Sequence, residues 1–187
     1  MIVYLDTSAF VPLLVVEPSS PACRRLWDDA DVVVSSRLLY VEAAAALAQA
    51  RRLDRMTVRA HRAGLKLLDD LWAQMDVAEV DQPLVERAAA VAYRFGLRGY
   101  DAVHCASAEQ LDDGDLVAAA GDRQLINAWQ ATGAGHLRQL GRCPLVSPRR
   151  GPAVAALAGS SSRRKQAHGR VDRGADSRSF GWNCGCN

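Results

Sequence analysis

Short apolar runs recur through the first 140 residues of the chain, and helix-forming stretches separate them. The runs lie at about residues 2–5, 31–36, 76–80 and 115–120, and HLRQL at 136–140 is a candidate for a last, edge strand. Strands that are apolar throughout are typical of parallel sheets whose two faces are both buried. The alternation therefore predicts an α/β fold in which helices cover both faces of a central, mostly parallel sheet of four to five strands.

The stretches between these runs predict helices. They are rich in alanine and leucine, which lose little conformational freedom in a helix, and several repeat apolar residues at helical spacing. We expect helices directly after Asp6, before Asp29, at about 37–52, 55–72 and 82–95, from Asp101 to about Leu111, and from Asp122 to about 131.

The composition divides the chain into two parts. Of its 187 residues, 49% are apolar, which is enough for the core of one domain, and we place that domain at residues 1–147. From Pro148 onward the sequence is rich in Gly, Ser, Arg and Pro, and it carries the basic excess behind the net charge of +2. We expect residues 148–187 to form a disordered tail, either simply solvated or weakly attracted to nucleic acid.

Several features of the sequence predict a cytoplasmic protein. The longest apolar run, around residues 8–16, is shorter than the roughly 20 residues that span a bilayer, and MIVYLD lacks the positive segment of a signal peptide. The five cysteines are irregularly spaced, which fits neither a disulfide framework nor a zinc site. We interpret them as reduced thiols: Cys23, Cys105, Cys143, Cys184 and Cys186.

Four acidic residues stand where apolar runs end or helices begin: Asp6, Glu42, Asp101 and Asp122. In open α/β sheets, sites form beyond the carboxyl ends of the strands, which is where Asp6 is expected. Each aspartate is alternatively an ordinary helix N-cap. Glu42 lies mid-helix beside four alanines, so its carboxylate is predicted to be paired or metal-bound, a solvated helix face being the other interpretation. Together the four predict a cluster of carboxylates.

Such a cluster has a predictable chemistry. Crowded carboxylates repel one another, which raises their pKa values unless a cation compensates. Their hard oxygen atoms suit Mg²⁺ or Mn²⁺. A cation makes a bound water more acidic and stabilises the charge that develops when a phosphodiester is hydrolysed, leaving 5′-phosphate and 3′-hydroxyl ends. The four acids therefore predict metal-dependent phosphodiester hydrolysis, with either one or two ions.

Three polar residues near the acids are candidates for supporting roles. Thr7 and Ser8 directly follow Asp6, so a hydroxyl there either orients the carboxylate or caps the following helix. His104, one turn after Asp101, is a candidate general base. A single histidine on an Ala-rich helix is more often a buried structural group, so we assign His104 no catalytic role.

Four segments of the chain resemble a known family. LDTSAF, YVEAAAAL, YDAVHCASA and GDRQL, in this order, are similar to segments of the PIN-domain ribonucleases, and in particular of the VapC-type toxins of bacterial toxin–antitoxin pairs. The resemblance covers about residues 1–140, and YDAVHCASA is its most specific part. It implies a compact PIN-like α/β/α sandwich that cleaves RNA with Mg²⁺ or Mn²⁺. One departure is Ala120, where the family often has Thr or Ser; this bears on the role of Asp122.

The resemblance also implies roles and partners. The catalytic residues are Asp6, Glu42, Asp101 and Asp122, the three aspartates hold the metal, and Thr7 or Ser8 is an accessory polar contact. Because an acidic cluster repels RNA, basic groups must guide the RNA backbone, and Arg98 and Arg123 are candidates, although each is more often a solvated surface residue. The implied partners are a small VapB-like antitoxin and a second copy of the chain, with residues 37–52 and 55–72 as the candidate dimer interface.

Rival functions fit the sequence less well. A phosphatase with an aspartyl nucleophile needs a second aspartate where this chain has Ser8, and a phospho-accepting receiver domain needs a late lysine, whereas the only lysines are Lys66 and Lys165. Two alternatives remain: a PIN-fold interaction module without activity and a DNA-directed nuclease. Metal-dependent loss of RNA, abolished by Asp6→Asn, would separate the enzyme from the module.

Overall fold

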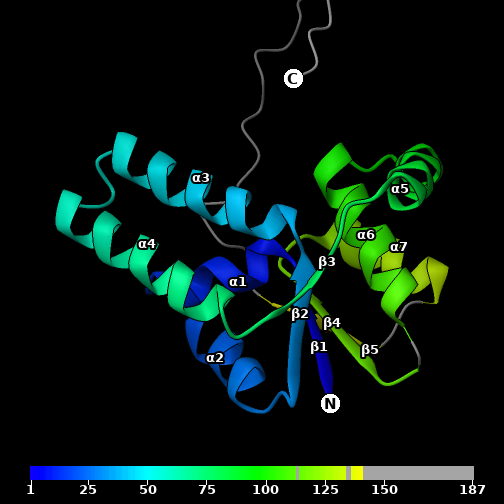
Figure 1. Ribbon diagram of the computed structural model, residues 1–187, viewed down its shortest axis with the longest axis horizontal. Helices are drawn as coiled ribbons and strands as arrows, with labels where there is room; N and C mark the ends of the chain where they lie inside the picture. The colour runs from blue at the N-terminus through cyan, green and yellow to red at the C-terminus, as the bar shows by residue number, and fades with distance from the viewer. Residues whose placement is uncertain (113, 134–135, 141–187) are drawn as a thin grey trace, which may run out of the picture. The chain divides into compact units, whose positions relative to one another are not determined.

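The computed structural model describes residues 1–112, 114–133 and 136–140. The predicted tail at 148–187, and the domain boundary before it, lie outside the described residues. Within the described ranges the expected strands and helices are present, with ends shifted by a few residues (Figure 1). Their order is β1 (Ile2–Leu5), α1 (Thr7–Leu14), α2 (Ser20–Asp28), β2 (Val32–Ser36), α3 (Leu38–Arg52), α4 (Val58–Trp72), β3 (Asp76–Ala78), α5 (Gln82–Phe95), α6 (Gly99–Leu111), β4 (Leu116–Ala120), α7 (Arg123–Thr132) and β5 (His136–Gln139).

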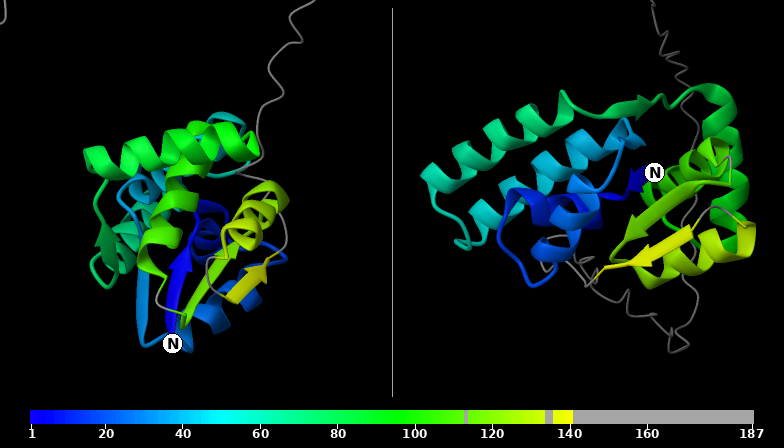
Figure 2. Two further views of the ribbon diagram at one scale, coloured as in Figure 1. Left: turned by 90° about the vertical axis from the view of Figure 1, so that its right-hand side faces the viewer. Right: turned by 90° about the horizontal axis from the view of Figure 1, so that it is seen from below.

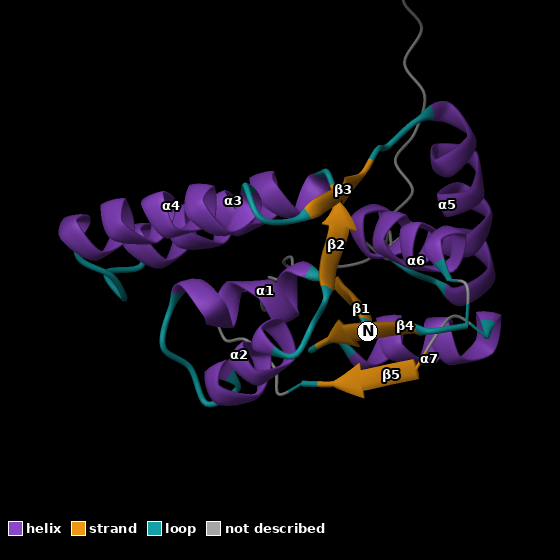
Figure 3. Cartoon of the chain, turned by 60° about the horizontal axis from the view of Figure 1, so that its bottom comes forward, coloured by secondary structure: helices purple, strands orange, loops and turns teal. Residues whose placement is uncertain are grey.

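The strands form one sheet in the order β3-β2-β1-β4-β5, and every neighbouring pair is parallel (Figure 3). The central strand β1 pairs on both sides, since Ile2 is in register with Val32 of β2 and with Leu116 of β4. HLRQL forms the edge strand β5, as predicted. Because all strands run in one direction, their carboxyl ends meet at one edge of the sheet.

Alternate side chains of β1 point to opposite faces of the sheet. Val3 and Leu5 are fully buried in a core shared with α1, α2, α3 and α4, whereas Tyr4 is fully buried in a second core with α5, α6 and α7. The two groups of helices lie on the two sides of the sheet in Figures 1 and 2. The predicted α/β/α sandwich is therefore confirmed, and it explains why the strands are apolar throughout.

The helix ends follow local rules. The side chains of Thr57 and Asp81 cap α4 and α5 by accepting from backbone N–H groups three residues on, over 3.1 and 3.0 Å. Gly96 and Gly133 end α5 and α7 in the left-handed conformation, with φ of 64° and 79°, which glycine adopts without steric cost. In the part of the chain that the structure describes, every helix is too short or too polar to cross a bilayer.

Candidate active site

Asp6 and Asp122 lie at the carboxyl ends of neighbouring strands. β1 ends at Leu5 and β4 at Ala120, and Leu5 is in register with Ala119. The backbone N–H of Asp6 donates to the carbonyl of Ala119 over 3.0 Å, which extends the strand pairing to the acid itself. The sheet therefore brings together two acids that are far apart in the sequence, at the edge where open α/β sheets form their sites.

Glu42 and Asp101 reach this edge from the two helical layers. Glu42 lies on α3, and Asp101 lies in the first turn of α6, on the other side of the sheet (Figure 1). His104 of α6 connects the layers, because its Nε2 lies 2.8 Å from Glu42 Oε2 and 3.7 Å from Asp6 Oδ1. Both helical layers and the sheet thus contribute acids to one place.

The electrostatics of Asp101 show that three of the acids are close together. Burial, together with the negative charges of Asp6 and Asp122, raises the pKa of the Asp101 carboxyl from its ordinary value of 3.8 to about 6. His104 and Arg98 act in the opposite direction but do not outweigh this repulsion. A carboxyl held in this way is the kind of group that a nearby cation would return to its charged form.

Ser8 links the carboxylate of Asp6 to the backbone of Gly121, which directly precedes Asp122. Its backbone N–H donates to Asp6 Oδ2 over 3.0 Å, and its hydroxyl donates to the same oxygen. The N–H of Gly121 donates in turn to Ser8 Oγ over 2.6 Å. The buried Ser8 hydroxyl therefore orients the Asp6 carboxylate and supplies a hydroxyl contact directly before Asp122, in a chain that has Ala120 in β4.

The hydroxyl of Thr7 binds Glu42 rather than Asp6. Thr7 Oγ1 donates to Glu42 Oε2 over 2.7 Å, and His104 approaches the same oxygen. Burial works against the charged form of Glu42, but these two partners outweigh it and hold the pKa of Glu42 below its ordinary value. The Glu42 side chain is 21% exposed and paired, so the solvated-face interpretation is wrong.

His104 is the residue of the site that the sequence left unassigned. Its ring is fully buried, and its Nδ1 lies 2.9 Å from the hydroxyl oxygen of Tyr4. Burial opposes the charged form of the imidazole, but the carboxylates of Glu42, Asp6 and Asp101 raise its pKa above the ordinary value. The sequence carried one signal for this residue, its spacing of three from Asp101, which places both side chains on one face of the helix.

The N-cap interpretation is correct for two of the acids. The carboxylate of Asp6 caps α1, and Asp122 Oδ1 caps α7 by accepting from the N–H of Gln124 over 2.7 Å. Asp101 lies within the first turn of α6, whose N-cap is Arg98. In both aspartates the capping hydrogen bond uses one carboxylate oxygen. An aspartate that caps a helix can therefore also belong to the acidic cluster.

The two arginines predicted to contact RNA are both exposed. Arg98 is close enough to Asp101 for its charge to lower the pKa of that carboxyl. Arg123 is the first residue of α7 and directly follows Asp122. Within residues 1–112, 114–133 and 136–140, neither guanidinium forms an ion pair with a carboxylate. Arg98 therefore lies near Asp101, and Arg123 follows Asp122 in the chain, without an ion pair among the described residues that would occupy either guanidinium.

The donor set of the cluster suits a hard divalent cation. Among the described residues, no group of three or more Asp, Glu, His or Cys side chains is arranged so that it could hold a metal ion. Mg²⁺ does not require such a set, because it keeps several waters and usually binds one or two carboxylates together with substrate phosphates. Burial, and after it the charges of Asp6 and Asp122, raise the pKa of Asp101, and a cation beside the carboxylate would act in the opposite direction. The oxygen donors of the cluster are therefore of the type that Mg²⁺ or Mn²⁺ binds when few protein ligands are used.

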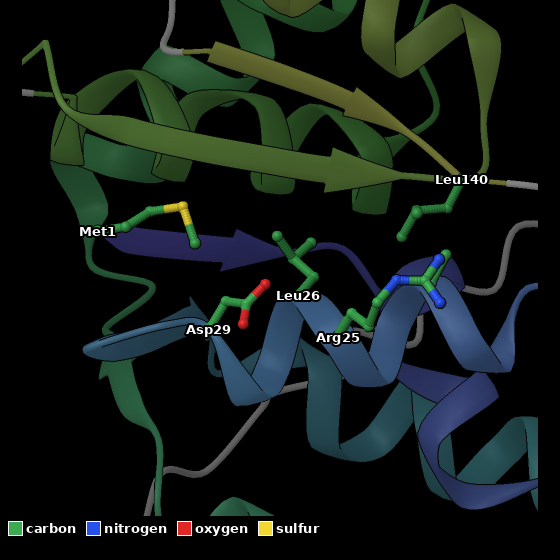
Figure 4. Close-up of a pocket in the computed structure, with 6 residues that line it drawn as sticks. Met1, Arg25, Leu26, Asp29 and Leu140 are labelled. Atoms are coloured by element: carbon green, nitrogen blue, oxygen red, sulfur yellow. The ribbon is translucent and has the colours of Figure 1, made fainter.

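A cavity elsewhere in the fold is distinct from this cluster. It lies beside α2 and has a volume of about 330 Å³, and the side chain of Leu26 forms part of its lining between Met1 and Leu140 (Figure 4). Its walls are formed by Met1, Ala22, Arg25, Leu26, Asp29 and Leu140. None of the four acids lines this cavity.

Comparisons with known proteins agree with this geometry. Residues 3–128 match the PIN domain family, a range that contains all four acids. The chain is 40% identical over 132 residues to Ribonuclease VapC45 of Mycobacterium tuberculosis (strain CDC 1551 / Oshkosh), an alignment that covers 71% of this chain and 92% of that protein. It is 38% identical over 109 residues to Ribonuclease VapC46 of Mycobacterium tuberculosis (strain ATCC 25618 / H37Rv), covering 58% of this chain and 75% of that one.

Solved structures share the fold at lower sequence identity. FitAcB from Neisseria gonorrhoeae superposes with a TM-score of 0.57 at 18% identity, covering 74% of this chain and 97% of that one. VapC20 of Mycobacterium tuberculosis, a Sarcin-Ricin loop cleaving toxin, superposes with a TM-score of 0.53 at 23% identity, covering 67% of this chain and 94% of that one. These similarities support the α/β/α fold.

Proposed function

Because this chain belongs to the PIN domain family, and within it to the VapC-type ribonucleases, we propose that it is a Mg²⁺-dependent endoribonuclease, the toxin of a toxin–antitoxin pair. The observation that carries the proposal is the convergence of the acids: Asp6 and Asp122 follow the ends of the paired strands β1 and β4, and His104 Nε2 lies 2.8 Å from Glu42 and 3.7 Å from Asp6. Such a cluster costs stability unless a cation fills it. We also propose that the protein acts in the cytoplasm, where its RNA substrate would be found.

Each residue of the cluster has a role in this proposal. Asp6, Asp101 and Asp122 would hold the cation, which would supply Lewis-acid stabilisation of the phosphoryl oxygens and acidify the attacking water. Asp6 has Oδ2 committed to Ser8, which leaves Oδ1 for this purpose. Glu42 has Oε2 committed to Thr7 and His104, so its Oε1 would accept the hydrogen bond that orients the water. Arg98 and Arg123 would bind the RNA backbone on either side.

Digestion of matched RNA and DNA oligonucleotides tests the reaction. We expect RNA to be cut in Mg²⁺ or Mn²⁺, and excess chelator to abolish the cleavage. The fragments should carry 5′-phosphate ends, which a ligase that requires this group can detect. Asp6→Asn should be inactive, whereas Asp81→Asn, which alters an N-cap on α5 away from the cluster, should keep full activity. Cleavage of DNA alone would instead support the DNA-directed nuclease, and no cleavage of either polymer would support the interaction module.

The proposed antitoxin is a small VapB-like protein that binds over the acidic cluster. His104 and Arg98 do not offset the effects that raise the pKa of Asp101, so an Arg or Lys from a partner would find carboxylates there that it could pair with. We expect the chain to copurify with a small protein when both are expressed from the native locus, and the pair to cleave RNA more slowly than the isolated chain. Purification of the chain alone from that locus would contradict this.

We also propose a homodimer through α3 and α4. The segment from α3 to the start of α4 exposes four large apolar side chains, Tyr40, Val41, Leu53 and Val58, which are 37%, 57%, 46% and 49% accessible. Burying them against a second copy removes apolar surface from water. Light scattering should give twice the chain mass at micromolar concentration. A monomer that persists at higher concentrations would exclude this interface.

A further inference from the structure

A buried line of side chains runs from the sheet to Glu42. Tyr4 lies on the central strand β1, and its hydroxyl oxygen is 2.9 Å from Nδ1 of His104. The other ring nitrogen of His104, Nε2, is 2.8 Å from Oε2 of Glu42. Tyr4 and His104 are both fully buried, and their rings meet edge-on with centroids 5.9 Å apart. These side chains therefore connect the central strand of the sheet to one carboxylate of the site.

The direction of the bond between His104 and Glu42 does not depend on the charge of the imidazole. Glu42 is held ionised, and an ionised carboxylate only accepts hydrogen bonds. Nε2 of His104 must therefore carry its proton and donate, whether the ring is neutral or cationic. When the ring is neutral, Nδ1 accepts the hydroxyl proton of Tyr4, which burial keeps protonated by raising the pKa of Tyr4.

Both donors to Glu42 use the same carboxylate oxygen. Thr7 Oγ1 lies 2.7 Å from Oε2, and His104 Nε2 lies 2.8 Å from it. Among the described residues, no hydrogen bond to Oε1 is formed, and the side chain is 21% exposed. Two donors on one oxygen define the rotation of the carboxylate about its last bond, so Oε1 has a defined position from which to contact a cation or water.

We propose that His104, held by Tyr4, is a positioning residue that fixes Glu42 in its reactive rotamer. The proposal rests on the ribonuclease function above. His104 itself is not a catalytic residue, because its ring is fully buried and Nε2 is already committed to Glu42. A partly exposed glutamate without such partners has several accessible rotamers, and the hydrogen bond from His104 orders one of them before the reaction.

Two substitutions at His104 separate positioning from packing. His104→Leu fills a similar volume without a donor, whereas His104→Gln places an amide N–H near the position of Nε2. We expect His104→Leu to lower kcat for RNA cleavage by about 10–100-fold, with KM changed less than about twofold. His104→Gln should restore most of kcat. Tyr4→Phe, which removes only the hydroxyl behind the ring, should give a smaller loss, also in kcat.

Cys105→Ala is the matched control, because Cys105 is fully buried on the same helix with its nearest neighbours in the core. It should lower the melting temperature while leaving kcat unchanged in the folded protein. Equal losses for His104→Gln and His104→Leu, or a loss that appears only in KM, would overturn the proposal. The proposal would also be overturned if Cys105→Ala and His104→Leu, compared at equal stability, lost the same factor in kcat.

Nitrogen-15 NMR of the imidazole tests the same inference without any reaction. The wild-type protein should show a proton on Nε2 of His104 that exchanges slowly with solvent, because it is buried and bonded to Glu42. A bare Nε2, with the proton on Nδ1 alone, would overturn the proposal even if every variant folds poorly. If the protein cleaves no RNA, the proposed function fails, whereas this measurement still decides whether His104 holds Glu42.

Discussion

Replacing Asp101 with asparagine is expected to abolish most of the activity while making the metal-free protein more stable. Asparagine has nearly the same shape as aspartate but no negative charge, so a cation and the developing charge in the reaction lose one of their partners. Losses on the order of 10²–10³-fold in kcat are typical when one such electrostatic partner is removed. Initial rates of RNA cleavage in saturating Mg²⁺ would measure this loss.

The gain in stability follows from the raised pKa of Asp101. Its value of about 6 lies above the ordinary 3.8, so the charged form of Asp101 destabilises the fold at neutral pH. Discounted for solvent screening, this cost is about 1 kcal/mol. It should disappear as the pH falls from about 6 to about 4, because the folded state then binds the proton. Urea denaturation of both proteins without metal should show a difference at neutral pH and none near pH 4.

Added Mg²⁺ should reverse the order of stability. A cation that binds only the folded wild-type protein stabilises it in proportion to the logarithm of its concentration. The variant should gain much less because it has lost a ligand. Asp81→Asn serves as a control, since it should show neither the stabilisation at neutral pH nor the weaker response to Mg²⁺. An Asp101→Asn variant that is less stable than wild type in chelator would contradict the description of a repulsive cluster.

The strands and the positions of two of the acids could be predicted from the sequence because their signals are local. A parallel strand buried on both faces is a short apolar run, and the residue that follows it lies at a known edge of the sheet. That logic placed Asp6 and Asp122 correctly. From the sequence alone, helix capping and membership of the acidic site are alternatives for each aspartate. In the structure the capping hydrogen bond uses one carboxylate oxygen, so the two roles are compatible.

The hydrogen bonds within the site could not be predicted, because each joins residues that only the folded chain brings together. Ser8 binds the N–H of Gly121, which is 113 residues away, and His104 binds Glu42, which is 62 residues away. Nothing in the sequence around Ser8 or His104 distinguishes them from an ordinary serine or a buried structural histidine. Whether a hydroxyl orients Asp6 or Glu42 depends on the turn between β1 and α1, and Thr7 and Ser8 divide these two tasks between them.

Replacing Trp129 with alanine is expected to have the largest effect on stability. Trp129 on α7 is fully buried, and its ring packs edge-on against Tyr4 with centroids 6.0 Å apart. Removing a buried tryptophan side chain costs about 3–5 kcal/mol, through lost apolar burial and the cavity left behind. For a domain of this size the melting temperature should fall by roughly 10 °C. Thermal unfolding followed by circular dichroism would measure it.

Trp129→Phe is expected to cost much less than alanine, because the indole is not fully satisfied where it lies. Its Nε1 is buried and has no hydrogen-bond partner among the described residues. Phenylalanine keeps an aromatic ring beside Tyr4 and removes this unpaired donor, so the smaller volume is partly offset, and we expect a loss below about 2 kcal/mol. Tyr93→Ala is the surface control, since Tyr93 is 94% exposed and its loss should change stability by less than about 0.5 kcal/mol. Equal losses for alanine and phenylalanine at position 129 would mean that the indole N–H is bonded after all.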